Sequence, residues 1–245
     1  MWTLGFDSTS PTVTAALLDG HRLVSQYTAD SAASHSTTLL PAIESVLASV
    51  GMGVRELGLI SVSAGPGSFT GVRIGTACAK GLAFAYDTPC IGVSSLEAMA
   101  YLFCDLPCFV YSSLSARHNN VFGALFKSDG NGNVIRITDD ALISADKAAE
   151  TVVGISDAPV YLVGDGDTLL TPHLAEATGF ELSHTPESLR RPSGYGTALA
   201  GLNAFENSGS SESFRAEQLM PIYLRKSQAE REREARADEI RPNDR

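Results

Sequence analysis

Residues 63–75 read S-A-G-P-G-S-F-T-G-V-R-I-G. They follow a short apolar run, Leu59–Val62, which predicts a buried strand, and they precede an Ala- and Gly-rich stretch that predicts a helix up to Tyr86. A strand, a glycine-rich turn and a helix in this order present backbone N–H groups at a helix N-terminus. The turn is therefore either a tight βα connection or a phosphate cradle. It lacks the G-K-[ST] ending of a Walker P-loop.

A row of small residues runs along the predicted helix. Gly71, Gly75, Ala79 and Ala83 recur every four residues, so they share one side of the helix. Because Gly inside a helix costs roughly 1 kcal/mol relative to Ala, two glycines in this row indicate a demand for close packing. The close neighbour is either the sheet of the same domain or a helix of a partner.

The composition bounds the class of protein. The chain has 245 residues, is 44% hydrophobic and has a net charge of −10. Apolar runs stay well below the roughly 18 residues of a membrane span, and the N-terminus enters a strand pattern directly, so we expect a cytoplasmic protein. Its acidity argues against a lone nucleic-acid binder. The cysteines, Cys78, Cys90, Cys104 and Cys108, are expected as free thiols.

The order of elements defines the fold class. Residues 1–103 predict three antiparallel strands over residues 2–28, followed by alternating helices and strands. This order is that of a ribonuclease-H-like α/β lobe, which occurs twice in the actin/Hsp70/sugar-kinase (ASKHA) superfamily. Residues 104–220 repeat the order in reduced form, and residues 221–245 form a charged tail. We therefore expect an N-terminal lobe, 1–103, with a dimerisation face, a smaller C-terminal lobe, 104–220, and the tail.

Two glycine-bearing or polar turns are expected to face each other across a cleft between the lobes. The first strand ends at Asp7 and continues into Ser8 and Thr9, where ASKHA proteins contact phosphate and metal. Gly164 and Gly166 follow a predicted strand in the second lobe. These five residues are candidate nucleotide or phosphate contacts. They support one possible function, that of a small-molecule kinase or ATPase.

Several motifs resemble the TsaB (YeaZ) family, historically labelled M22 glycoprotease-like. They cover most of the chain, and the 63–75 stretch is highly specific to the family. They are L-G-F-D-S-T-S at 4–10, H-S-T-T-L-L-P-A-I at 35–43, S-A-G-P-G-S-F-T-G-V-R-I-G at 63–75, G-V-S-S-L-E-A at 92–98 and P-I-Y-L-R-K at 221–226.

The resemblance implies a scaffold subunit without catalytic residues. Its partners would be the catalytic paralogue TsaD and the ATPase TsaE, and the product of the complex would be N6-threonylcarbamoyladenosine at adenosine 37 of ANN-decoding tRNAs. The resemblance implies no intrinsic cofactor, although ATP or ADP is possible within the complex, and tRNA contact only through the complex.

The positions of the paralogue's metal-binding histidines are occupied by Ser95 and Met99 in this chain. A hydroxyl and a thioether do not replace two imidazoles as ligands, so we expect neither a metal site nor metalloprotease activity. Ser115 and Asn120 also replace two acids that are usual in the family. Their loss argues against phosphoryl transfer, which needs acids to hold Mg²⁺.

Two helices are expected to form the interface with the paralogue or, in the isolated protein, with a second copy. These are residues 35–50 and 69–86, in a packing of four helices. The row of small residues on the second helix would let a partner helix approach closely, and the first helix would supply apolar area. The predicted interface residues are Leu39, Ile43, Val46, Val50, Gly71, Gly75, Ala79 and Ala83.

A third possibility is direct contact of the tail with tRNA inside an assembly. The tail carries cationic side chains among alternating acids, and a solvated helix or frayed end explains the same pattern. The cations are Arg225, Lys226, Arg231, Arg233 and Arg236.

Overall fold

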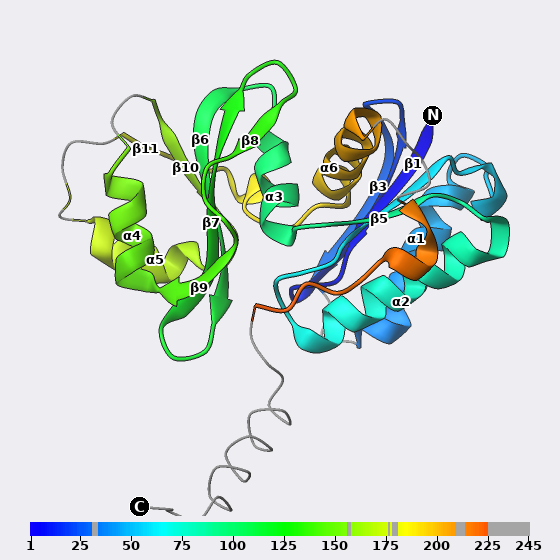
Figure 1. Ribbon diagram of the computed structural model, residues 1–245, viewed down its shortest axis with the longest axis horizontal. Helices are drawn as coiled ribbons and strands as arrows, with labels where there is room; N and C mark the ends of the chain where they lie inside the picture. Colours follow the sequence, from blue (N-terminus) through cyan, green and yellow to red (C-terminus); the bar gives the residue numbers. More distant parts are fainter. Residues whose placement is uncertain (31–33, 156–157, 176, 178–180, 209–213, 225–245) are drawn as a thin grey trace, which may run out of the picture.

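The computed structural model describes residues 1–30, 34–155, 158–175, 177, 181–208 and 214–224. Two sheets form two lobes that lie side by side, with one short helix between them (Figure 1). No helix within the described ranges is long and apolar enough to cross a membrane. The part of the charged tail from residue 225 onward, interpreted above as a solvated helix or a frayed end, lies outside these ranges. All four cysteines are free, as expected.

The first sheet has the order β3-β2-β1-β4-β5. The β1–β2 and β2–β3 pairs are antiparallel, and the β1–β4 and β4–β5 pairs are parallel. Three helices cover it, α1 and α2 on one face and α6 on the other (Figure 1). The bounds are β1 Trp2–Asp7, β2 Thr12–Asp19, β3 Arg22–Asp30, α1 His35–Ala48, β4 Leu59–Ser63, α2 Phe69–Tyr86, β5 Cys90–Val93 and α6 Gly194–Asn207.

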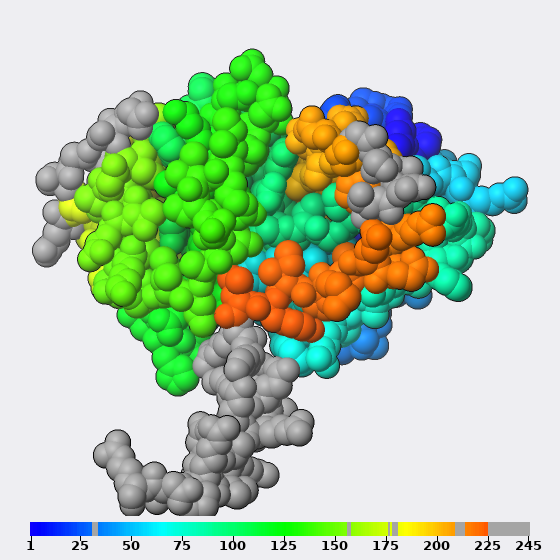
Figure 2. Space-filling model, viewed as in Figure 1, coloured from blue at the N-terminus to red at the C-terminus, as the bar shows by residue number. Residues whose placement is uncertain are grey.

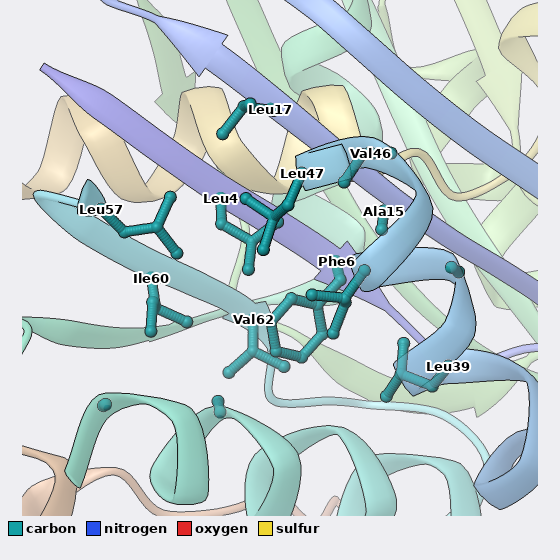
Figure 3. Packing of buried hydrophobic residues seen from close by; sticks show 14 of the residues in the cluster. Leu4, Phe6, Ala15, Leu17, Leu39, Val46, Leu47, Leu57, Ile60 and Val62 are labelled. Atoms are coloured by element: carbon teal, nitrogen blue, oxygen red, sulfur yellow. The ribbon is translucent and has the colours of Figure 1, made fainter. Parts of the chain in front are cut away.

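Alternation along the strands explains this layering. Leu4 and Phe6 on β1 and Val62 on β4 point into the core beneath α1 and α2, where they meet Leu39 and Val46 (Figure 3). On β2, Ala15 and Leu17 face the same core, whereas Ala16 and Leu18 point to the other face and pack against α6. Successive side chains of a strand point to opposite faces, so a strand that is buried along its length must be covered on both sides.

The second sheet repeats the first. Its order is β11-β10-β6-β7-β8. The antiparallel strands β6, β7 and β8 correspond to β1, β2 and β3, and the parallel strands β10 and β11 correspond to β4 and β5. The short strand β9 also pairs with β7 and was not predicted. The bounds are β6 Pro107–Ala116, β7 Asn120–Asp129, β8 Val134–Arg136, β9 Ala141–Ser144, α4 Ala145–Val153, β10 Val160–Val163, α5 Asp167–Leu174 and β11 Leu182–Ser183.

The lobes are joined through α3, Ser95–Ala100 (Figure 1). Its Ala98 packs in the core beside α6, whereas Leu96 and Met99 pack in the core of the second lobe. Glu97 forms an ion pair of 2.6 Å with Arg136 of β8. Short 3-10 turns complete the fold at η1 Val54–Glu56, η2 Tyr101–Phe103, η3 Glu187–Leu189 and η5 Ala216–Gln218.

Helix α6 was expected in the second lobe but packs on the first sheet. Its backbone lies directly on β1, because a Cβ on Gly5 would overlap the backbone of Gly194 and Ala198. Ser61 of β4 also donates a hydrogen bond of 2.6 Å to the carbonyl oxygen of Thr197. The chain therefore returns to the first lobe after completing the second. The predicted C-terminal lobe, 104–220, thus contains a helix that belongs to the first lobe.

The C-terminal segment, residues 214–224, also lies against the first lobe (Figure 2). Leu219 is buried in the core beneath α2, and the Ile222 N–H donates a 2.7 Å hydrogen bond to the carbonyl oxygen of Ala64. Leu224 packs against the core of the second lobe. The segment thus crosses from one lobe to the other beside the glycine-rich turn.

Candidate functional site

The turn between β4 and α2 is a tight connection filled by the chain itself. Gly65 and Gly67 have φ values of +112° and +153°, which L side chains rarely adopt. The Ser68 N–H donates a 2.7 Å hydrogen bond to the carbonyl oxygen of Thr9, and the Ser68 hydroxyl accepts from the Gly71 N–H. The Ser68 and Gly71 amides thus already have acceptors, one of them in the β1–β2 turn, which favours the tight-connection interpretation over the phosphate cradle.

The row of small residues on α2 faces inward. A Cβ on Gly71 would overlap the carbonyl oxygen of Ser8, and a Cβ on Gly75 would lie 2.8 Å from the Ser8 hydroxyl oxygen. Ala79 and Ala83 are buried in the first core. The close neighbour is therefore the β1–β2 turn and the sheet of the same lobe. The expectation that these four residues face a partner is wrong.

The apolar residues predicted for the same interface on α1 are also core residues. Leu39, Ile43 and Val46 are each 1% exposed and pack on the sheet. They stabilise the lobe and are not available for docking. Val50, which follows α1, is 37% exposed. It alone of the four has the exposure that a docking residue needs.

A different set of residues forms the exposed side of α2, which we call the α2 outer face. Arg73, Ala77 and Gly81 are exposed and recur every four residues. Phe84 lies on the same side and is 77% exposed, and Phe69 is 37% exposed at the start of the helix. A Cβ on Gly81 would meet nothing within 4 Å. The face thus offers small residues flanked by large exposed rings, which suits a helix of another molecule.

Asp7 is buried at the end of β1 and does not reach the cleft. Its Oδ1 accepts hydrogen bonds from the backbone N–H and the hydroxyl of Thr9, at 2.6 and 2.9 Å. Its Oδ2 has no hydrogen-bond partner within the described part of the chain. Burial raises the pKa of the Asp7 carboxyl, and the opposing effects of Ser63, Thr9 and His35 do not cancel the shift.

Asp7→Asn is expected to flatten part of the pH dependence of stability. Because the folded-state pKa of Asp7 lies above its ordinary value, the folded state holds an extra proton between the two values, and its relative stability falls as pH rises through that window. The variant lacks this loss, so it gains stability relative to the native chain as pH rises above the ordinary pKa of an aspartate. Urea unfolding of both proteins over a series of pH values measures the difference; equal changes in both proteins would contradict the assignment.

A pocket of about 610 Å³ lies between the lobes. One wall comes from the β1–β2 turn and the other from the β10–α5 turn, so the sequence correctly brought these turns together. Gly164 lines the pocket, whereas Ser8 and Thr9 are buried behind its wall and Gly166 packs on Ser113. The lining residues are Ser10, Pro11, Thr12, Asp30, Leu114, Gly164, Asp165, Asp167, Thr168, Glu187, Arg190, Arg191 and Pro192.

The charges of this pocket are predominantly acidic. Arg190 lies 3.6 Å from Asp167, and Arg191 pairs with both Asp30 and Glu187. Burial raises the pKa of the Asp167 carboxyl, and the charge of Arg190 opposes the shift. Both arginines of the lining are thus engaged by acids. The Gly164 N–H donates to the Arg190 carbonyl oxygen and the Gly166 N–H to that of Ser113, so neither amide is free for a phosphate.

The positions where the paralogue would carry metal-binding histidines are packed into the structure. The Ser95 hydroxyl donates a hydrogen bond to the carbonyl oxygen of Pro66, and Met99 is buried in the second core. Both side chains hold α3 in place. Over the described ranges, no group of three or more His, Cys, Asp or Glu residues is placed to hold a metal ion.

The two positions that lack the usual family acids lie on either side of the β6–β7 turn. The Ser115 N–H donates a 2.8 Å hydrogen bond to the carboxylate of Asp165, and the Asn120 side-chain amide donates one of 3.2 Å to the carbonyl oxygen of Arg117. The first contact connects the end of β6 to the β10–α5 turn, and the second is local to the β6–β7 turn.

Two lobes, each with three antiparallel strands followed by two parallel ones, form the actin-like fold of the ASKHA class. YeaZ from Pseudomonas aeruginosa has this fold, with a TM-score of 0.74 and 24% identity over 91% of this chain and 99% of that chain. A ROK hexokinase from Thermus thermophilus has a TM-score of 0.50 and 12% identity over 85% of this chain and 100% of that chain. At such identities the likeness concerns the fold alone.

The sequence comparisons give the family. A family model described as TsaD, tRNA N6-adenosine threonylcarbamoyltransferase, matches residues 26–163. The Bacillus subtilis tRNA threonylcarbamoyladenosine biosynthesis protein TsaB is 31% identical over 237 residues, which cover 94% of this chain and 96% of that protein. This chain belongs to the TsaB family, as its motifs indicated.

Proposed function

We propose that this chain is a non-catalytic subunit in the synthesis of N6-threonylcarbamoyladenosine at adenosine 37 of ANN-decoding tRNAs. It binds and activates a TsaD-type paralogue, helps to recruit a TsaE-type ATPase, and contacts tRNA only through the complex. The description of its Bacillus subtilis relative supports the process. A role in tRNA modification also implies a cytoplasmic location.

The observation that carries the proposal is the α2 outer face. Ala77 and Gly81 leave room for a second backbone, and Phe84, at 77% exposure, supplies apolar area that the lobe does not use. On the neighbouring helix, Leu40 is 45% exposed. Exposed apolar rings beside small residues on one helix are typical of a surface that packs against another helix. In the isolated protein a second copy can occupy the same face.

The packing at α3 supports a non-catalytic role. The Ser95 hydroxyl and the Met99 side chain serve the packing of α3, so the paralogue's metal centre has no counterpart at these two positions. The activity of the complex would then depend on groups of the paralogue. This chain would contribute the surface that holds the paralogue in its active arrangement.

The alternative function, a small-molecule kinase or ATPase, makes a different prediction for nucleotide binding. We expect the isolated chain to bind MgATP no more tightly than about 1 mM. The acids of the pocket outnumber its arginines, both arginines are engaged, and the turn amides already have acceptors. Titration calorimetry measures the affinity. Saturable, Mg²⁺-dependent binding with turnover would favour the kinase.

The experiment that tests the proposal is reconstitution of tRNA modification. TsaD- and TsaE-type proteins from the same organism are combined with unmodified tRNA, the threonylcarbamoyl donor and ATP, with and without this chain. The modified nucleoside is expected only when this chain is present.

A further inference from the structure

One side chain of the α2 outer face is charged and held in a fixed position. The Arg73 guanidinium carbon lies 4.0 Å from the centroid of the Phe69 ring. The Arg73 Nε donates a 2.9 Å hydrogen bond to the hydroxyl oxygen of Tyr223, and the Phe69 and Tyr223 ring centroids are 5.1 Å apart. Stacking and hydrogen bonding together hold the guanidinium on this exposed face.

No carboxylate in the described part of the chain neutralises the charge of Arg73. Four arginines of the described ranges pair with at least one carboxylate, namely Arg22, Arg136, Arg190 and Arg191, whereas Arg55, Arg117 and Arg215 have no ion pair there. Arg73 forms no ion pair with any described residue, and its only polar contact there is the Tyr223 hydroxyl. Within the described ranges, neither terminal NH₂ group of the guanidinium has a hydrogen-bond partner. Their fork geometry matches the two oxygens of a carboxylate or the oxygens of a phosphate.

We propose that Arg73 binds a carboxylate of the protein partner that docks on the α2 outer face, and that Phe69 and Tyr223 position it for this contact. The proposal rests on the proposed function, because it concerns the partner of that same face. A protein carboxylate fits better than a nucleic-acid phosphate. Among the described residues of α2, Ala77, Gly81 and Phe84 are exposed and uncharged and Lys80 is partly buried, whereas nucleic-acid surfaces gather several cations, and the chain has a net charge of −10.

The position of Tyr223 links the C-terminal segment to docking. Leu219 and Ile222 anchor the segment to the core and to the glycine-rich turn, which places Tyr223 beside Arg73. A guanidinium already held by two rings loses less side-chain freedom on binding than an unrestrained one. The segment thereby completes a surface that α2 alone would leave less ordered.

The test is the affinity of the full chain for the TsaD-type partner of the same organism, measured by calorimetry at about 0.05 and about 0.5 M salt. Arg73→Ala is expected to weaken binding about 10- to 100-fold and to reduce its salt dependence. Arg73→Lys keeps the charge but loses the fork, so an intermediate loss is expected. Tyr223→Phe removes one hydroxyl and should weaken binding about threefold. Arg22→Ala, at an exposed arginine on β3, is the matched control and should bind like the native chain.

The outcomes separate this inference from the proposed function. Undiminished affinity of Arg73→Ala and Arg73→Lys, in a chain that still binds its partner, overturns the role of Arg73 alone. Undiminished protein affinity together with weaker tRNA binding by the whole complex identifies a phosphate and also overturns it. Failure of the native chain to bind the partner at all overturns the proposed function and this inference together. Thermal unfolding of each variant verifies the fold, and Tyr223→Phe tests the positioning role if Arg73→Ala is less stable.

Discussion

Gly81→Trp is expected to leave the chain folded and to abolish its assembly with the TsaD-type partner. A side chain at this position meets nothing within 4 Å in the isolated molecule, so its bulk costs the fold little. In a complex that uses the α2 outer face, the indole occupies space needed by the partner's helix. We expect affinity to fall by about 100-fold or more, which corresponds to about 3 kcal/mol, and tRNA modification to fall with it. Size-exclusion chromatography and calorimetry measure assembly.

The matched control for this experiment is Gly81→Ala. A methyl group at the same position adds little volume and should preserve assembly, while Ala favours the helix. Full assembly by Gly81→Trp would place the docking surface elsewhere on the molecule. Loss of assembly by both variants would point to a site with no room for even one methyl group, and would still support docking at this face.

Gly71→Ala is expected to destabilise the fold strongly, although it sits on the same helix as Gly81. The added Cβ would overlap the carbonyl oxygen of Ser8, a backbone atom of the β1–β2 turn that cannot move without disturbing its neighbours. The Ser8 hydroxyl also donates a 2.9 Å hydrogen bond to the Gly71 carbonyl oxygen, which ties the two segments together. Overpacking of this kind costs about 3 kcal/mol or more.

The same substitution at Gly81 again provides the comparison. Gly81→Ala is expected to stabilise the chain by about 0.5 to 1 kcal/mol through helix propensity alone. Chemical denaturation of both variants therefore should give free energies of unfolding that change in opposite directions. A loss of less than about 1 kcal/mol for Gly71→Ala would show that the β1–β2 turn adapts easily. In that case close packing against the β1–β2 turn would not explain the row of small residues on α2.

The sequence predicted the order of elements well because each element carries its own local pattern. Strands such as β1 and β4 consist mainly of apolar residues, and α1 and α2 begin after Ser34 and Ser68, which are residue types typical of helix starts. Strands β9 and β11 were missed because Ala141–Ser144 and Leu182–Ser183 are too short to show a period. The position of α6 on the first sheet was not predicted. Its small residues indicate close packing on a sheet, but this pattern is the same for either of the two similar sheets.

The candidate interface was assigned to the wrong side of both helices for a related reason. Close spacing of glycines and alanines indicates a near neighbour but does not identify it. The neighbour is Ser8, which is 63 positions from Gly71 in the chain, and no local pattern reveals such a contact. Gly81 and Phe84 carried a usable signal, because a glycine and a large ring on the side opposite the buried row are unexpected on a purely structural helix.

The interlobe site shows a similar limit. The sequence correctly placed the turns after β1 and β10 on either side of one pocket. It did not predict that Asp7 would be buried behind the wall. Arg190 and Arg191 were not singled out, because their partners Asp167 and Asp30 come from distant parts of the chain. Charge balance in a pocket depends on such long-range pairs, and the local pattern does not contain them.

The most direct test of the central claim is the amount of N6-threonylcarbamoyladenosine formed on tRNA by the reconstituted system with the native chain, with Gly81→Trp, with Gly81→Ala and with no TsaB-family protein. The proposed function predicts modification with the native chain and with Gly81→Ala, and background levels in the other two reactions. Equal modification in the presence and absence of this chain would contradict it.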